Sequence, residues 1–77
     1  MRRFALYYSL DSGEWKLVND GPIDELRSKM MNDYSIFLND GHIQHKRRAS
    51  YRIVEQGRNS SGNWLDLKVL DFKKFDK

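Results

Sequence analysis

Residues 19–33 read NDGPIDELRSKMMND, and their apolar residues have a different period from those on either side, which indicates the fold class. They recur at i, i+3, i+7 and i+8, the spacing of one face of an α-helix, and they are Ile23, Leu26, Met30 and Met31. Pro22 suits the first helical position, and Asp24 and Glu25 complement the positive end of the helix dipole. The pattern predicts a helix over residues 22–32.

The sequence before this helix has the period of strands. From Arg3 to Leu10 every second residue is apolar or aromatic, as in a strand with one buried face. Asp11, Ser12 and Gly13 then supply turn chemistry, because glycine tolerates positive φ and the Asp and Ser side chains bond to nearby backbone amides. We therefore expect a hairpin into a second strand over residues 14–19.

A second hairpin is predicted after the helix. Residues 34–38 are rich in β-forming types, and the Asn-Asp-Gly sequence at 39–41 favours a tight turn. A strand over residues 42–53 would return from this turn. Residues 55–63, EQGRNSSGN, have the composition of a loop.

A last strand is expected from Trp64 to Phe72, with Leu65, Leu67 and Val69 on one side. The predicted order is therefore β-β-α-β-β-β. This order indicates an α+β fold, a mostly antiparallel sheet with the helix packed on one face. One helix cannot cover both faces of five strands, so the other face must be solvated or form a binding surface.

Length and composition predict one compact domain over residues 1–77, with the last few residues frayed. The 77 residues include 39% hydrophobic and 13% aromatic side chains, enough for one small core. There is no cysteine, which fits a reducing compartment, and neither a secretory signal nor a membrane span is recognisable. We expect a cytoplasmic protein.

No pattern of catalytic residues is present. The sequence has no nucleophile elbow and no glycine-rich loop that opens a helix, and so short a chain has little volume for a pocket that excludes water. On a strand, His42 and His45 point to opposite faces, which disfavours a metal site. We expect neither enzymatic activity nor a cofactor.

The charges are segregated along the chain. Residues 11–41 carry seven acidic and three basic side chains, whereas residues 42–58 carry five basic side chains and one acidic. The period of a strand places Lys46, Arg48 and Arg52 on one face, at intervals that suit a phosphate backbone. The predicted nucleic-acid-binding residues are Lys46, Arg47, Arg48, Arg52 and Arg58.

Most aromatic residues are needed for the core of a domain this small. Three of them are candidates for stacking on bases or for anchoring an interface, namely Tyr51, Trp64 and Tyr7.

Two functions remain open from the sequence. The first is a non-enzymatic module that binds DNA or RNA through phosphate contacts with little base specificity. The second is a protein-interaction module, such as a small phage-type inhibitor or adaptor, that docks on an acidic partner surface or on a sheet edge. An edge-to-edge homodimer belongs to this second class. In size and lack of cysteine the chain resembles the small accessory proteins of phages and mobile elements, although no motif supports that resemblance.

Overall fold

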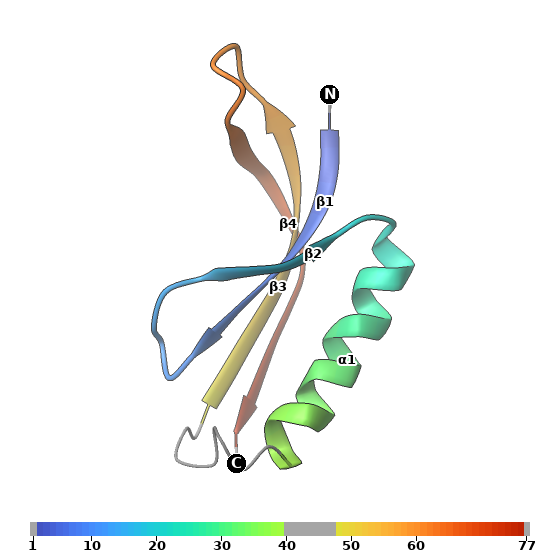
Figure 1. Ribbon diagram of the computed structural model, residues 1–77, viewed down its shortest axis with the longest axis vertical. Helices are drawn as coiled ribbons and strands as arrows, with labels where there is room; N and C mark the ends of the chain where they lie inside the picture. Colours follow the sequence, from blue (N-terminus) through green and yellow to red (C-terminus); the bar gives the residue numbers. More distant parts are fainter. Residues whose placement is uncertain (1, 40–47, 77) are drawn as a thin grey trace.

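The computed structural model describes residues 2–39 and 48–76. These residues form β1 (Arg2–Leu10), β2 (Lys16–Asp20), α1 (Ile23–Asn39), β3 (Arg48–Arg58) and β4 (Trp64–Asp76). The four strands make one antiparallel sheet in the order β2-β1-β3-β4, with α1 alongside it (Figure 1). The predicted small α+β domain with an antiparallel sheet is confirmed at this level.

The pairing of β1 with β3 forms the centre of the sheet. It runs through all nine residues of β1, from Arg2 opposite Gly57 to Leu10 opposite Ala49. The turn after β1 fastens this pair at one end, because the Asp11 N–H donates to the Arg48 carbonyl and the Asp11 carboxylate accepts from the Arg48 N–H, both at 2.9 Å. Asp11 has a φ of 50°, a conformation that aspartate tolerates better than most residues do.

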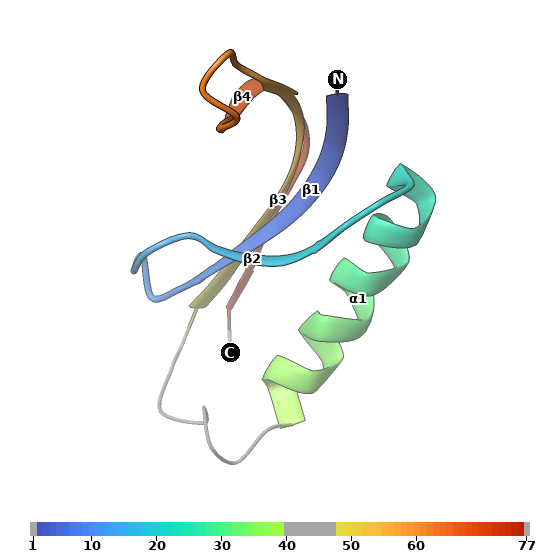
Figure 2. The same ribbon diagram turned by 45° about the horizontal axis from the view of Figure 1, so that its top comes forward.

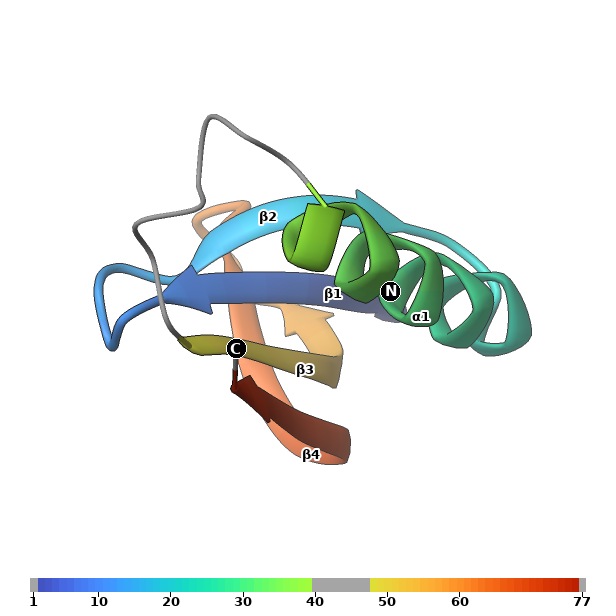
Figure 3. The same ribbon diagram turned by 90° about the horizontal axis from the view of Figure 1, so that it is seen from below.

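The main core lies between α1 and one face of the sheet. Figure 2 and Figure 3 show the helix on one side of the sheet only. The buried cluster consists of Leu6, Leu26, Met30, Ala49, Tyr51 and Ile53. Of the four helix positions that the apolar spacing predicts to be buried, Leu26 and Met30 are buried, Ile23 is partly buried and Met31 is half exposed.

The predicted strand over residues 34–38 is wrong. The helix does not end at residue 32 but continues to Asn39, so the sheet has four strands among the described residues and not five. No glycine or proline lies between Ile23 and Asn39, so nothing in the sequence stops the helix. Strand propensity depends strongly on context, and here helix propagation outweighs it. The turn predicted at residues 39–41 and the histidines at 42 and 45 lie outside the described residues, apart from Asn39.

The loop predicted over residues 55–63 is shorter in the structure. β3 continues to Arg58, and a tight turn over residues 59–63 leads into β4. In this turn the Asn59 side chain accepts hydrogen bonds from the Ser61 and Asn63 N–H groups at 3.0 and 2.9 Å. β4 extends to Asp76 opposite Arg48, so the residues expected to be frayed are paired up to that position.

β4 carries two irregularities that change which face its side chains occupy. Between the pairs Ile53 to Asp71 and Val54 to Val69, Leu70 has no opposite residue. Likewise, Leu67 has no opposite residue, because Glu55 pairs with Lys68 and Gln56 pairs with Asp66. Each such bulge shifts the alternation of the strand by one residue. Val69 therefore shares the face of Val54, turned away from the helix, and the prediction that it shares a side with Leu65 and Leu67 is wrong.

Tyr51 gives the core a measurable pH dependence. Burial, and after it the charges of Asp33 and Tyr8, raise the pKa of its hydroxyl from 10.0 to about 12. Because the folded-state pKa lies above the unfolded one, the resulting stability is present below pH 10 and is lost as the pH rises through 12. We expect the free energy of unfolding to fall by about 2 kcal/mol over this interval.

Urea denaturation at a series of pH values tests this expectation. The Tyr51→Phe variant should lose most of the alkaline decline, whereas the Tyr7→Phe variant, which keeps Tyr51, should retain it. An equal decline in wild type and in Tyr51→Phe would show that another group is responsible.

Candidate ligand-binding face of the sheet

The face of the sheet opposite α1 gathers arginine and aromatic side chains from β1, β3 and β4 and from the β1–β2 turn. The register places Tyr7 opposite Arg52, which in turn lies opposite Phe72. We call this surface the arginine–aromatic face, and it consists of Arg3, Tyr7, Trp15, Leu17, Arg52, Gln56, Arg58, Trp64, Asp66, Val69, Phe72 and Lys74.

Arg52 lies at the centre of this face, between aromatic rings. Its guanidinium carbon is 4.5 Å from the centroid of the Trp15 ring and 5.7 Å from that of Tyr7. Its Nη2 donates to Asp66 at 3.3 Å. The Trp15 ring also meets Phe72 edge to face, with centroids 6.2 Å apart. Trp15 therefore reaches from the β1–β2 turn across to β4 and covers the middle of the sheet.

Gln56 is buried in the arginine–aromatic face and connects the polar groups of that face through hydrogen bonds. Its amide oxygen accepts from Arg3 Nε at 2.8 Å, and its amide nitrogen donates to the Tyr7 hydroxyl at 2.9 Å and to Asp66 at 2.7 Å. A buried amide with this many partners fixes their positions relative to one another. The carboxylate that holds Arg52 is thus itself held in place.

Trp64 forms the end of the face near the β3–β4 turn. Two guanidinium carbons lie over its ring, that of Arg3 at 4.4 Å and that of Arg58 at 5.4 Å. Arg3 also bonds to Asp20 at 2.8 Å, and Arg58 donates to the Gly62 carbonyl at 3.0 Å. Both arginines are therefore held close to the tryptophan.

The surface combines exposed apolar area with cations. Leu17, Val69 and Phe72 are 49%, 50% and 46% exposed. Arg58 and Lys74 are exposed and form no ion pair among the residues that the structure describes. They lie toward opposite ends of the sheet, because Arg58 is opposite Trp64 and Lys74 is opposite Ser50.

The predicted binding residues are only partly brought together. Arg52, Arg58, Tyr7 and Trp64 share the arginine–aromatic face, and Arg48 is exposed at the start of β3. From Arg48 to Arg58 the strand spans about 33 Å. Lys46 and Arg47 lie outside the described residues.

Tyr51 does not fit the predicted role in stacking. It is 3% exposed and packs in the core under α1, with Phe75 and Tyr8 as its aromatic neighbours at 5.7 and 6.4 Å. A ring buried to this extent offers no face to a base. The alternation of β3 places Tyr51 on the side opposite Arg52.

Little in the sequence distinguishes Trp15, Phe72 or Arg3 as a functional residue. The spacing of Trp15 and Phe72 predicts core residues, and the contact between them depends on the register of four strands. The signal that was available is the alternation of β1, which puts Arg3 on the same face as Tyr7.

Asp66, the one acidic residue in the set that defines this face, accepts hydrogen bonds from both Arg52 and Gln56. Within residues 2–39 and 48–76 no group of His, Asp and Glu side chains is placed to hold a metal ion. The helix in the described part of the chain is too short and too polar to cross a membrane.

No protein-family model, curated protein or solved structure matches the sequence or the fold.

The Gln56 network should contribute to stability. Gln56→Met keeps the approximate size of the side chain but leaves Arg3, Tyr7 and Asp66 without their shared partner. We expect the free energy of unfolding to fall by about 1–3 kcal/mol, the cost of leaving buried polar groups unsatisfied. Chemical denaturation measures this change, and a loss within about 0.5 kcal/mol, as for an ordinary surface substitution, would contradict the assigned role.

Proposed function

We propose that this protein is a non-enzymatic, cytoplasmic module that binds single-stranded nucleic acid through the arginine–aromatic face. The observation that carries the proposal is the set of four contacts between arginines and aromatic rings on one sheet face. Proteins that bind single-stranded nucleic acid place positive charges along the phosphate backbone of the ligand. They also present aromatic rings or guanidinium planes on which its bases stack. This face has both kinds of group.

The roles of the side chains follow from their exposure and pairing. Trp15 and Phe72 offer ring surface at the centre of the face, beside the guanidinium of Arg52. Arg58 and Lys74 supply cations toward the two ends for phosphates. Stacking requires unpaired bases, and every base has a π-face, so we expect a preference for single strands over duplexes and little discrimination among bases.

The test is fluorescence anisotropy of labelled single-stranded and duplex DNA and RNA over a salt series. The double variant Arg58→Gln and Lys74→Gln removes two cations of the face. Its matched control is Lys68→Gln and Lys73→Gln, which removes two exposed cations of β4 whose register partners, Glu55 and Tyr51, lie on the helix side.

We expect the wild-type affinity for single strands to fall log-linearly with salt. The slope should be shallower by about one to two in the Arg58/Lys74 variant, because each lost phosphate contact removes about 0.7 from the slope for single strands. The control variant should change affinity only slightly. Equal losses in the two variants would show that net charge and not this face binds the strand, and no binding at low salt would overturn the proposal.

The carboxylate of Asp66 should weaken binding. It forms an ion pair with the guanidinium of Arg52 at 3.3 Å and so competes with a phosphate for that group. Asp66→Asn keeps the shape of the side chain and frees the charge of Arg52, so we expect the affinity for single strands to rise about three- to tenfold at low salt.

Asp71→Asn is the control for Asp66→Asn. It makes the same change in net charge on the same strand, but Asp71 pairs at 3.6 Å with Arg27 of α1 and so lies on the helix side. Tightening by the same factor in both variants would show that Asp66 acts only through net charge.

The exposed apolar residues favour a second candidate function, a protein interface on the same face. Leu17, Val69 and Phe72 are each about half exposed, and Trp, Tyr and Arg are the residues most often found as interface anchors. Under this alternative the partner is a protein, for which a small inhibitor or adaptor is the model. Absence of binding to every oligonucleotide, together with loss of a partner on Phe72→Ser, would favour it.

A further inference from the structure

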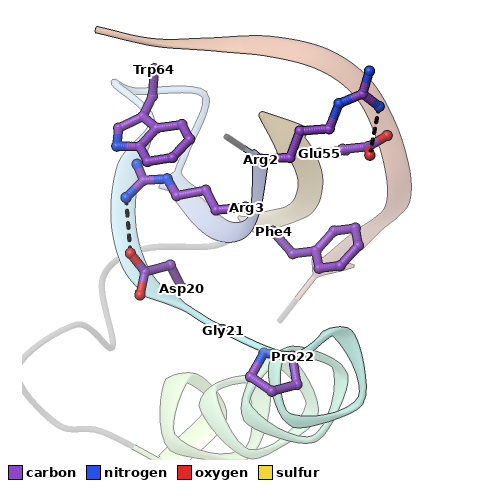
Figure 4. A pocket seen from close by; sticks show the side chains of 8 residues that line it. All are labelled: Arg2, Arg3, Phe4, Asp20, Gly21, Pro22, Glu55 and Trp64. Carbon is purple, nitrogen blue, oxygen red and sulfur yellow. Dashed lines mark hydrogen bonds and ion pairs between the residues drawn. The ribbon is translucent and has the colours of Figure 1, made fainter. Parts of the chain in front are cut away.

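A pocket lies beside β1 at the end of the molecule where β2 has already left the sheet. β2 pairs with β1 only from Ala5 to Tyr8, so among the described residues no strand adjoins Arg2 to Phe4 on that side. The pocket has a volume of about 470 Å³, within the range of ligand sites. Figure 4 shows Phe4 between the Arg2–Glu55 pair and the Gly21–Pro22 corner, with Trp64 and Arg3 across from it.

The corner at Gly21 and Pro22 explains why β2 ends here. The Gly21 N–H donates to the Phe4 carbonyl at 3.2 Å, the last bond between the two segments. Gly21 has a φ of 144°, which residues with a side chain rarely adopt, and Pro22 has no N–H to continue the ladder. The chain turns into α1 and leaves the first part of β1 as an open edge.

The backbone of this edge has a defined direction. Because the Phe4 carbonyl accepts from Gly21, it points away from β3, and the backbone groups of residues two apart in a strand point the same way. The N–H and carbonyl of Arg2 therefore point away from β3 and into the open edge. A donor and an acceptor at this spacing match the main chain of an extended peptide.

The charges around the pocket are paired with one another. Arg3 bonds to Asp20 at 2.8 Å, and Arg2 bonds to Glu55 at 3.2 Å. The walls between these two pairs are Phe4, Pro22 and the ring of Trp64. Such a pocket offers no free charge to an ionic ligand and favours a neutral, apolar side chain.

We propose that this pocket binds an extended peptide segment of a partner protein, which adds to β1 as an antiparallel strand beside Arg2–Phe4 and places one apolar side chain against Phe4 and Pro22. In strand addition of this kind, main-chain hydrogen bonds supply the affinity, and pockets for alternate side chains supply the specificity. The site is independent of the proposed nucleic-acid function, although Arg3 and Trp64 border both surfaces.

A second copy of this chain is a poor occupant of the edge. Two such edges in antiparallel pairing would bring the charged side chains of Arg2 and Arg3 of each copy to the pocket of the other, which favours an apolar side chain. The occupant is therefore a different polypeptide.

The other two sheet edges are less suited to strand addition. β4 has bulges and the charges of Lys68, Lys73 and Lys74, which are common protections of an edge strand. β2 has only five residues, and Lys16 and Asp20 stand at its ends. The edge at Arg2–Phe4 differs from both because a pocket adjoins it.

The test selects ligands from a displayed library of random peptides and compares two substitutions at Arg2. Arg2→Pro removes the backbone N–H that points into the edge, and proline is tolerated at the first residue of a strand. Arg2→Ala is the matched control, because it removes the same side chain, which is 69% exposed, and its ion pair but keeps the N–H.

We expect the selection to enrich peptides that alternate apolar and polar residues. Purified enriched peptides should bind wild type and Arg2→Ala within about threefold of each other and Arg2→Pro about tenfold more weakly, the effect of one main-chain hydrogen bond. In wild type, amide shifts on peptide binding should centre on Arg2, Phe4 and Gly21 and on the Trp64 indole. Thermal denaturation would confirm that both variants fold.

Failure to enrich any peptide above a blank surface would overturn the proposal. Equal binding to Arg2→Pro and Arg2→Ala, or amide shifts centred elsewhere, would also overturn it. Binding of oligonucleotides is a separate measurement and should be the same in the two Arg2 variants, so failure of this inference is distinguishable from failure of the nucleic-acid function.

Discussion

The uninterrupted pairing of β1 with β3 determines which side chains lie on each face of the sheet. Because side chains alternate along both strands, this one register creates two different surfaces at once. Leu6 and Ile53 meet on the helix side, and Tyr7 and Arg52 meet on the other. A slip of one residue would exchange the two sets and expose the core.

The single helix covers only one face of the sheet, so the other face is shielded from solvent by its own side chains. Ala5 and Val54 are fully buried although they face away from α1, and the side chains around them are large: Tyr7, Trp15 and Arg52. Arginine is suited to such a layer because its stem packs on apolar surface while its guanidinium lies on aromatic rings. The arginine–aromatic face is therefore in part a structural layer. The same feature makes it a candidate for binding, since ring and guanidinium surfaces remain at the boundary with solvent.

The sequence was sufficient for features that depend on local pattern. The helix start directly after Pro22, the burial of Leu26 and Met30 and the turn at Asp11 and Ser12 all follow from spacing and residue type. It was insufficient where a local preference competes with its context. Residues 34–38 have β-forming side chains, but they follow a helix with no residue that stops it.

The candidate site was predictable only in part for a related reason. Alternation along one strand correctly separates Arg52 from Tyr51, but the neighbours of Arg52 come from β1, β4 and the β1–β2 turn. Which residues of β4 share its face depends on two bulges, and the sequence has no clear signal for them. Trp15 reaches Phe72 only because four strands are in the order β2-β1-β3-β4.

The charge segregation of the sequence is not carried into the folded molecule unchanged. Asp20, from the acidic segment, bonds to Arg3, and Asp66 bonds to Arg52, from the basic segment. Such surface pairs add little stability, but they neutralise the middle of the arginine–aromatic face. Arg58 and Lys74 then supply charge toward its two ends. A polyanion would be attracted mainly at these ends, within a Debye screening length of roughly 10 Å. At the centre of the face, binding would depend on contact with the aromatic rings and with the plane of the Arg52 guanidinium. Under the proposed function, the fold would separate steering from stacking along one strand direction, a division that the linear order of charges does not contain.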